Sequence, residues 1–254
     1  MNRRLLLVLL CAVAMVAGCA SNRGRESRQS ASVVDFLFPG HKEAPALQPG
    51  VALLKPPVKV GIAFAPSDPK LRSLPEAEKV KLLERTRAAF LRQPYVATFE
   101  IIPTQYLKPG GGFANLDQVS RMFGVDIVAL VSYDQIHFTD SNAMAMLYWT
   151  IVGAYLVHGD EYDIKTLLDI SVFDVASRKL LFRAPGTSQI NGGASMANYS
   201  ERARAAQIEA YGKAVDDLIP KLTSEIESFR ARLATAGDIH LSPQPGYRIG
   251  AKAE

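Results

Sequence analysis

"VDIVALVSYDQIHF", residues 125–138, is the stretch of sequence on which the fold depends. Its apolar and β-branched residues follow one another almost without interruption, a pattern typical of a strand buried on both faces. We therefore predict that this segment is the central strand of a sheet.

The segments before the central strand predict two more strands. "VKVGIAFAP", residues 58–66, alternates apolar residues in the manner of a strand, and "TFEIIPTQYL", residues 98–107, has a similar composition. Pro103 favours an edge or the end of a strand for the second segment, because proline cannot donate a backbone hydrogen bond.

Two helices are predicted around the second strand. Pro75 and the acids that follow it open the first helix, and Pro94 stops it. Asn115 is the predicted N-cap of the second helix, which Gly124 closes. The buried face of the first helix is predicted to consist of Leu82, Leu83, Thr86, Ala89 and Phe90.

A hairpin and a long helix are predicted after the central strand. Residues 166–175 and 179–187 alternate well around the turn 176–178, and Gly192-Gly193 ends the sheet. Ser200 then begins a long helix, in which we expect a kink near Pro220. Its apolar stripe consists of Ile208, Tyr211, Val215, Leu218, Leu222, Ile226, Phe229 and Leu233.

The predicted order is β-α-β-α-β, an apolar insertion, then β-β-α. We expect an α+β fold with a mixed sheet of four to five strands, helices packed on one face and a long C-terminal helix. Residues 58–235 are assigned to this single periplasmic domain, and residues 236–254 to a loose C-terminal tail.

The insertion is the uncharged segment 143–157, which is too short to span a bilayer, since a spanning helix needs about 20 residues. Its apolar residues surround a helix instead of forming one stripe, which favours a buried core helix, although a strand is also compatible. The alternative is a surface exposed to the membrane or a partner, formed by Tyr148, Trp149, Ile151 and Tyr155.

The N-terminus has the order of a bacterial lipoprotein signal. Arg3 and Arg4 precede a short apolar run that ends in small residues. Val16-Ala17-Gly18-Cys19 matches the lipobox, in which the thiol forms a thioether to diacylglycerol before cleavage. We therefore predict a signal peptide over residues 1–18, cleavage between Gly18 and Cys19, and lipidation of Cys19.

The lipidated cysteine is predicted to lead into a flexible, proline-rich tether over residues 19–57. Residues 20–32 are polar and expected to be disordered, whereas "VVDFLFPG", residues 33–40, is apolar enough to dock on the domain or a partner. Fully stretched, the tether would reach up to about 120 Å. By resemblance to the bacterial sorting rule, the absence of aspartate at the second position favours the outer membrane.

Charge and cysteine content narrow the classes of partner. Removing residues 1–18 takes away two of the 29 basic residues. The 27 basic residues that remain exceed the 25 acidic residues by two, and a net charge of +2 gives no reason to expect a nucleic acid partner. Cys19 would be the only cysteine of the mature chain, so no intrachain disulfide can form.

No catalytic set emerges from the residue types, and no cofactor is expected. The four histidines, His41, His137, His158 and His240, lack the spacing of a helical zinc site, so no metal is expected either. "KPGGGF", residues 108–113, is similar to a phosphate nest but lacks the G-K-[ST] ending, which favours a turn. The remaining candidates for acid–base chemistry are the strand carboxylates Asp126, Asp134, Asp169 and Asp174.

The chain resembles the rhombotarget lipoproteins of Gram-negative bacteria. The resemblance rests on the lipobox, "VGIAFAP", "GGGFANLDQV", "DIVALVSYDQIHF", "YWTIVGAYLVHG" and "DVASRKLLFRAPGTSQ", which cover most of residues 33–190. The family is associated with rhombosortase, a protease that processes tails with a Gly-Gly motif followed by an apolar segment. This chain departs from that pattern, because it ends "PGYRIGAKAE" and Gly192-Gly193 is internal.

The order of elements is also similar to that of envelope lipoproteins that activate cell-wall synthases and of curli-secretion subunits, by analogy of fold alone. The leading hypothesis is a membrane-anchored, non-enzymatic lipoprotein whose periplasmic body binds an envelope protein. The alternatives are an envelope hydrolase that uses strand carboxylates and a subunit of an oligomeric secretion or pore assembly.

Overall fold

The computed structural model describes residues 25–39, 51–67, 73–141, 160–194, 199–233, 237 and 239–247. Several predicted sites lie outside these residues: Gly18 and Cys19 of the lipobox, and Tyr148, Trp149, Ile151 and Tyr155 of the uncharged segment 143–157. The signal peptide, the lipidation and the role of the apolar insertion therefore stay predictions.

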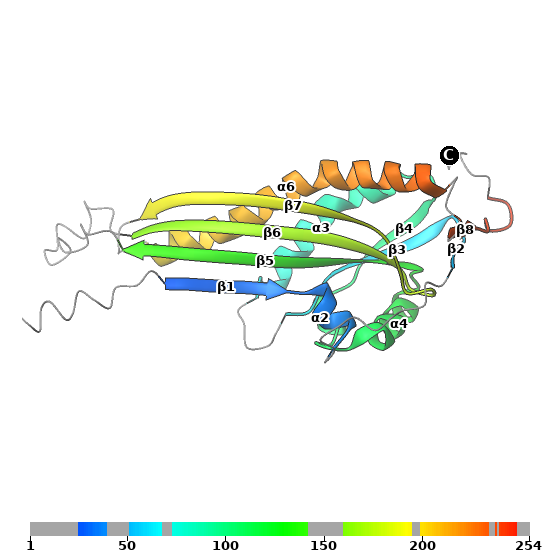
Figure 1. Ribbon diagram of the computed structural model, residues 1–254, viewed down its shortest axis with the longest axis horizontal. Coiled ribbons are helices and arrows are strands. Elements are labelled where there is room, and N and C mark those ends of the chain that lie inside the picture. Colours follow the sequence, from blue (N-terminus) through cyan, green and yellow to red (C-terminus); the bar gives the residue numbers. More distant parts are fainter. Residues whose placement is uncertain are drawn as a thin grey trace, which may run out of the picture. The chain divides into compact units, whose positions relative to one another are not determined.

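The core of the fold is a mixed six-stranded sheet in the order β4-β3-β5-β6-β7, with β1 (Arg25–Ala31) pairing with β5 outside this path (Figure 1). Strand β3 (Val58–Phe64) pairs in parallel with β4 (Val96–Ile101) and with the first part of β5 (Ile127–Ser141). β5 thus has neighbours on both sides, as predicted for residues 125–138.

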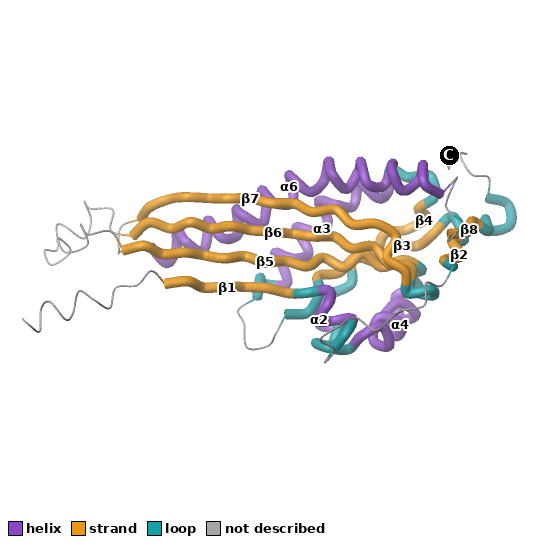
Figure 2. Tube along the Cα trace, viewed as in Figure 1, coloured by secondary structure: helices purple, strands orange, loops and turns teal. Residues whose placement is uncertain are grey.

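The predicted hairpin is present and its strands are longer than expected. β6 (Asp160–Asp174) and β7 (Lys179–Ala194) flank a turn that contains Arg178, whose φ is 60°. Figure 2 shows the long strands β5, β6 and β7 side by side. The second predicted strand is shorter than expected: it ends at Ile101, before Pro103 and the 3-10 helix η1 (Thr104–Tyr106).

We expected one domain over residues 58–235, whereas contacts divide the chain into two compact units. The first unit consists of Met1–Ser27, Ile136–Ile164 and Ile190–Ala206. The second consists of Arg28–Gln135, Lys165–Gln189 and Gln207–Glu254, and it contains the residues of the site described below.

In the second unit, α3 (Glu76–Leu91) and the C-terminal part of α6 (Tyr199–Leu233) lie on one face of the sheet. All five residues predicted for the apolar face of α3 are buried. Arg85 joins the two helices, because its guanidinium pairs with Asp216 and donates to the Gly212 carbonyl at 3.1 Å. None of the described helices is both long enough and apolar enough to cross a bilayer.

The apolar stripe of α6 is buried as predicted except at Ile208, which is 37% exposed, and at Leu233, which is partly buried. Ala210 and Ala214 take the buried positions in this part of the helix. Small side chains at these positions allow the helix to approach the sheet closely. The helix continues through Pro220 as one element.

Within the segment expected to be a flexible tether, residues 25–37 form regular structure instead. β1 is polar in sequence, but its backbone pairs with β5, and Arg28 binds Asp134 through Nε–Oδ1 and Nη2–Oδ2 contacts of 2.8 and 2.5 Å. The next residues form α2 (Val33–Leu37), which is capped by Ser32 and buries Val33, Phe36 and Leu37. Residues 33–37 of the apolar segment therefore dock on the domain, one of the two outcomes predicted for this segment.

The prediction that Asn115 caps a helix is wrong. α4 (Gly112–Phe123) begins three residues earlier and ends, as predicted, at Gly124 with a left-handed φ of 65°. Asn115 lies inside α4, where Oδ1 accepts from the Lys108 amide at 2.8 Å and Nδ2 donates to the Tyr106 carbonyl at 3.3 Å. Phe113 of this helix contacts Phe173 on the face of the sheet opposite α6, with ring centroids 6.2 Å apart.

We predict that Gly186→Ala destabilises the protein by about 1–3 kcal/mol. A Cβ at this position of β7 would lie 2.3 Å from the Ala214 carbonyl oxygen and 2.5 Å from the Leu218 Cβ, so backbone must shift to admit it. Urea denaturation of the mature chain measures the change. Gly237→Ala is the matched control, because an added Cβ there meets nothing within 4 Å; equal stability of the two variants would contradict the close approach of α6 to β7.

Candidate functional site: an apolar pocket

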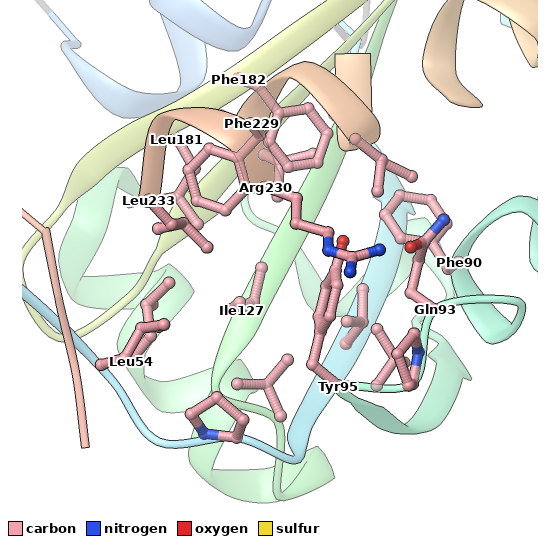
Figure 3. A pocket seen from close by; sticks show the side chains of 18 of the residues that line it. Leu54, Phe90, Gln93, Tyr95, Ile127, Leu181, Phe182, Phe229, Arg230 and Leu233 are labelled. Carbon is pink, nitrogen blue, oxygen red and sulfur yellow. The ribbon is translucent and has the colours of Figure 1, made fainter. Parts of the chain in front are cut away.

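The second unit contains a cavity of about 250 Å³ beneath the C-terminal ends of α3 and α6. Its walls are almost entirely aliphatic and aromatic side chains, as Figure 3 shows. The residues that line it come from segments far apart in the sequence, from Leu54 to Tyr247. A concave apolar site with a few polar groups is the usual form of a ligand-binding pocket.

The sheet and α6 supply most of the apolar wall. Val60, Ile127 and Val172, from three strands, are each buried to 6% exposure or less. On the helix side, Phe229 packs against Phe182 of β7 with ring centroids 5.2 Å apart. These side chains belong to the predicted strand 58–66, the central strand, the hairpin and the apolar stripe of α6. The sequence therefore indicated that they are apolar and inward, but not that they leave a space.

The remaining side of the pocket is closed by residues 239–247, which we call the closing segment. Its strand β8 (Ile239–Leu241) pairs in parallel with β2 (Ala52–Leu54). Gln244 Nε2 donates to the carbonyls of Lys55 and Pro57 at 3.2 and 3.1 Å, and the Tyr247 hydroxyl donates to the Pro94 carbonyl at 2.9 Å. The expectation of a loose tail over residues 236–254 therefore fails at the closing segment.

Sequence reasoning missed the closing segment because its pattern is weak. β2 and β8 have three residues each, and such short apolar pieces are not distinguishable from loop residues. The density of prolines around residue 56 and after residue 242 also favoured extended chain. Pairing with a distant segment supplies the hydrogen bonds that neither piece forms alone.

Four polar side chains line the pocket, namely Gln93, Tyr95, Arg230 and Tyr247, and Figure 3 shows the first three together on one side. The Tyr95 hydroxyl is buried and has no hydrogen-bond partner among the described residues. Burial raises the pKa of Tyr95 to about 12, while the positive charge of Arg230 acts in the opposite direction. Arg230 is exposed on α6, next to this hydroxyl (Figure 3).

The predicted carboxylates do not gather at this pocket. Asp126 is exposed and accepts from the Lys59 amide at 2.9 Å, and the buried Asp174 accepts from the amide and hydroxyl of Ser177 in the hairpin turn. Both therefore fix local backbone.

Asp134 and Asp169 line a second, more open hollow of about 820 Å³ on the opposite face of the sheet. Each carboxylate contacts an arginine, since Asp134 pairs with Arg28 at 2.5 Å and Asp169 with Arg183 at 3.1 Å. The hydrolase hypothesis stays a prediction.

The other candidate motifs have structural partners. Gly110 and Gly112 of "KPGGGF" have φ values of 66° and 63°, and Pro39 and the Leu37 carbonyl lie against them, so the loop is a turn packed on the end of α2. His137 is 9% exposed, and burial lowers its pKa. Among the described residues, no group of three or more His, Cys, Asp or Glu side chains is placed to hold a metal ion.

No protein-family model matches the chain, and no curated protein matches it. Among solved structures it is similar to the LpoB C-terminal domain from Salmonella enterica, with 12% identity, a TM-score of 0.29, and coverage of 54% of this chain and 86% of that one. It is also similar to the PelC dodecamer from Paraburkholderia phytofirmans, with 14% identity, a TM-score of 0.25, and coverage of 76% and 99%.

A third similar structure is the lipoprotein GNA1162 from Neisseria meningitidis, with 12% identity, a TM-score of 0.24, and coverage of 59% of this chain and 95% of that one. TM-scores this low carry no argument about function. Membership of the rhombotarget lipoprotein family stays a prediction.

We predict that Tyr95→Phe leaves the free energy of unfolding near pH 7 unchanged or raises it, because the lost hydroxyl has no partner among the described residues. The variant should also lack the tyrosinate absorbance that the native protein gains near pH 12. Since the native pKa lies above the unfolded value of about 10, folding stability is lost as pH rises from 10 toward 12, and Tyr95→Phe removes that share of the loss.

Spectrophotometric titration and urea denaturation check this prediction. Tyr106→Phe, which removes a 40% exposed tyrosine outside the pocket, is the control for the loss of one chromophore. A marked loss of stability at pH 7 in Tyr95→Phe would mean that the hydroxyl has a partner.

Proposed function

We propose that the protein is a lipid-anchored binding module of the bacterial cell envelope that holds an apolar group in the pocket and catalyses no reaction. The observation that carries this proposal is the cavity itself, about 250 Å³ with aliphatic and aromatic walls. Ordinary protein cores are packed without spaces of this size, so a space bounded by so many apolar side chains favours binding.

The cavity volume indicates the size of the bound group. Cavities of roughly 150 Å³ lined by Leu, Ile and Phe side chains stay free of water and bind benzene. A cavity of about 250 Å³ therefore has room for an aliphatic or aromatic group somewhat larger than one benzene ring.

The lipobox supports the anchoring part of the proposal, and β1 limits how far the anchored protein reaches. Because β1 begins at Arg25, only five residues separate its start from Cys19, and the six steps along the chain span at most about 20 Å. This is far less than the reach of about 120 Å expected for a tether that extends to residue 57. In an acylated chain, the start of β1 would therefore lie close to the bilayer surface.

We predict that Leu54→Trp weakens binding of the uncharged apolar dye N-phenylnaphthylamine by about tenfold or more. Leu54 lines the pocket and is 5% exposed, so an indole there occupies the space of the ligand. Leu53→Trp is the matched control, because Leu53 lies on the same strand, points outward and is 51% exposed.

Fluorescence titration of the mature chain measures both affinities, and urea denaturation reports whether each variant is folded. Equal affinity in a folded Leu54→Trp variant, or no binding to the native protein, would refute the binding function.

We predict that Cys19→Ser moves the protein from the membrane fraction to the soluble fraction and abolishes labelling with radioactive palmitate. A hydroxyl cannot form the thioether on which acylation depends. Ser21→Ala keeps the cysteine and should leave both readouts unchanged. If the Cys19→Ser variant still fractionates with membranes, acylation of Cys19 is not what anchors the protein.

A further inference from the structure

Three of the four polar side chains that line the apolar pocket lie together at one side of it. Figure 3 shows the Arg230 guanidinium beside the Tyr95 hydroxyl, with the Gln93 amide on the same side, whereas Leu54, Leu181 and Leu233 form the other side. A ligand that fits this arrangement has an apolar body and one polar end.

Two of these polar groups have free capacity to donate hydrogen bonds. The Tyr95 hydroxyl has no partner, and Arg230 forms neither an ion pair nor a hydrogen bond among the described residues. A guanidinium donates and never accepts, and its planar fork matches a carboxylate. The polar end of the ligand is therefore an acceptor with negative charge.

The apolar walls argue for an aliphatic chain as the body of the ligand. A peptide would bring backbone amides and carbonyls into a space whose lining, away from Arg230 and Tyr95, offers few hydrogen-bond partners. Burying such groups without partners costs free energy, whereas methylene groups lose nothing there.

We propose that the pocket binds a small anionic amphiphile, a single aliphatic chain whose carboxylate lies beside Arg230 and Tyr95. This inference rests on the proposed function, since it names the ligand class of the same pocket. Glu227, one helical turn before Arg230, places a negative charge near Tyr95 and opposes the carboxylate.

Competition with N-phenylnaphthylamine on the mature chain tests the inference, with decanoate and decanol as probes. They share one chain length and differ only in the head. The native protein should bind decanoate at least tenfold more tightly than decanol. Arg230→Met should abolish this preference while the affinity for decanol stays the same, and Arg230→Lys should restore part of it because the charge remains.

Glu227→Gln should have the opposite effect to Arg230→Met: it should strengthen the binding of decanoate and leave the binding of decanol unaffected. A substitution that only disturbed the packing of α6 would not affect the two probes differently. If both probes bind equally and Arg230→Met changes neither, the anionic head is refuted while the pocket function stands. If the dye binds but neither probe displaces it, the amphiphile is refuted while the pocket function stands; if the dye itself does not bind, both fail. Tighter binding of a tripeptide with a C-terminal leucine than of decanoate would replace the amphiphile by a peptide.

Discussion

The close approach of α6 to β7 is the constraint on which the second unit depends. At Gly186 any side chain would collide with the Ala214 carbonyl, so helix and strand are in near contact at this point. Four residues earlier on β7, Phe182 meets Phe229, and two aromatic rings require far more room. Small residues at one end and large ones at the other make the helix diverge from the sheet toward its C-terminus. The cavity lies where the two layers have separated.

The same divergence explains why the polar groups lie where they do. Where α6 diverges from the sheet, the Arg230 side chain extends from the helix over the cavity. The Tyr95 side chain comes from the segment just after α3, and its hydroxyl lies beside the Arg230 guanidinium (Figure 3). Neither finds a partner in the wall, because every neighbouring strand contributes an apolar side chain there. The pocket thus results from the way α6 packs on the sheet. One of its sides is polar and the other apolar because Arg230 and Tyr95 lie near the ends of α6 and α3.

Sequence patterns predicted the elements that are long and periodic. The continuous apolar run of residues 125–138, the stripe of α6 and the apolar face of α3 each imply burial, and the structure confirms these patterns apart from Ile208 and Leu233. The patterns failed where pairing with a distant segment decides the conformation. β1 is polar and depends on β5 and on the Arg28–Asp134 ion pair, and β2 and β8 are too short to show a period. The pocket could not be predicted, because residue types reveal which side chains are inward but not where packing leaves a space.

The parallel pairing of β2 with β8 determines when the pocket can be completed during folding. Leu54 and Leu241 stand side by side in one wall although nearly the whole folded chain separates them in sequence. A polypeptide that emerges from a translocation channel with its N-terminus first delivers the strands and α3 early, and residues 239–247 last. Until residues 239–247 pair with β2, the pocket lacks one of its walls, so it is complete only once the chain through residue 247 is available to fold.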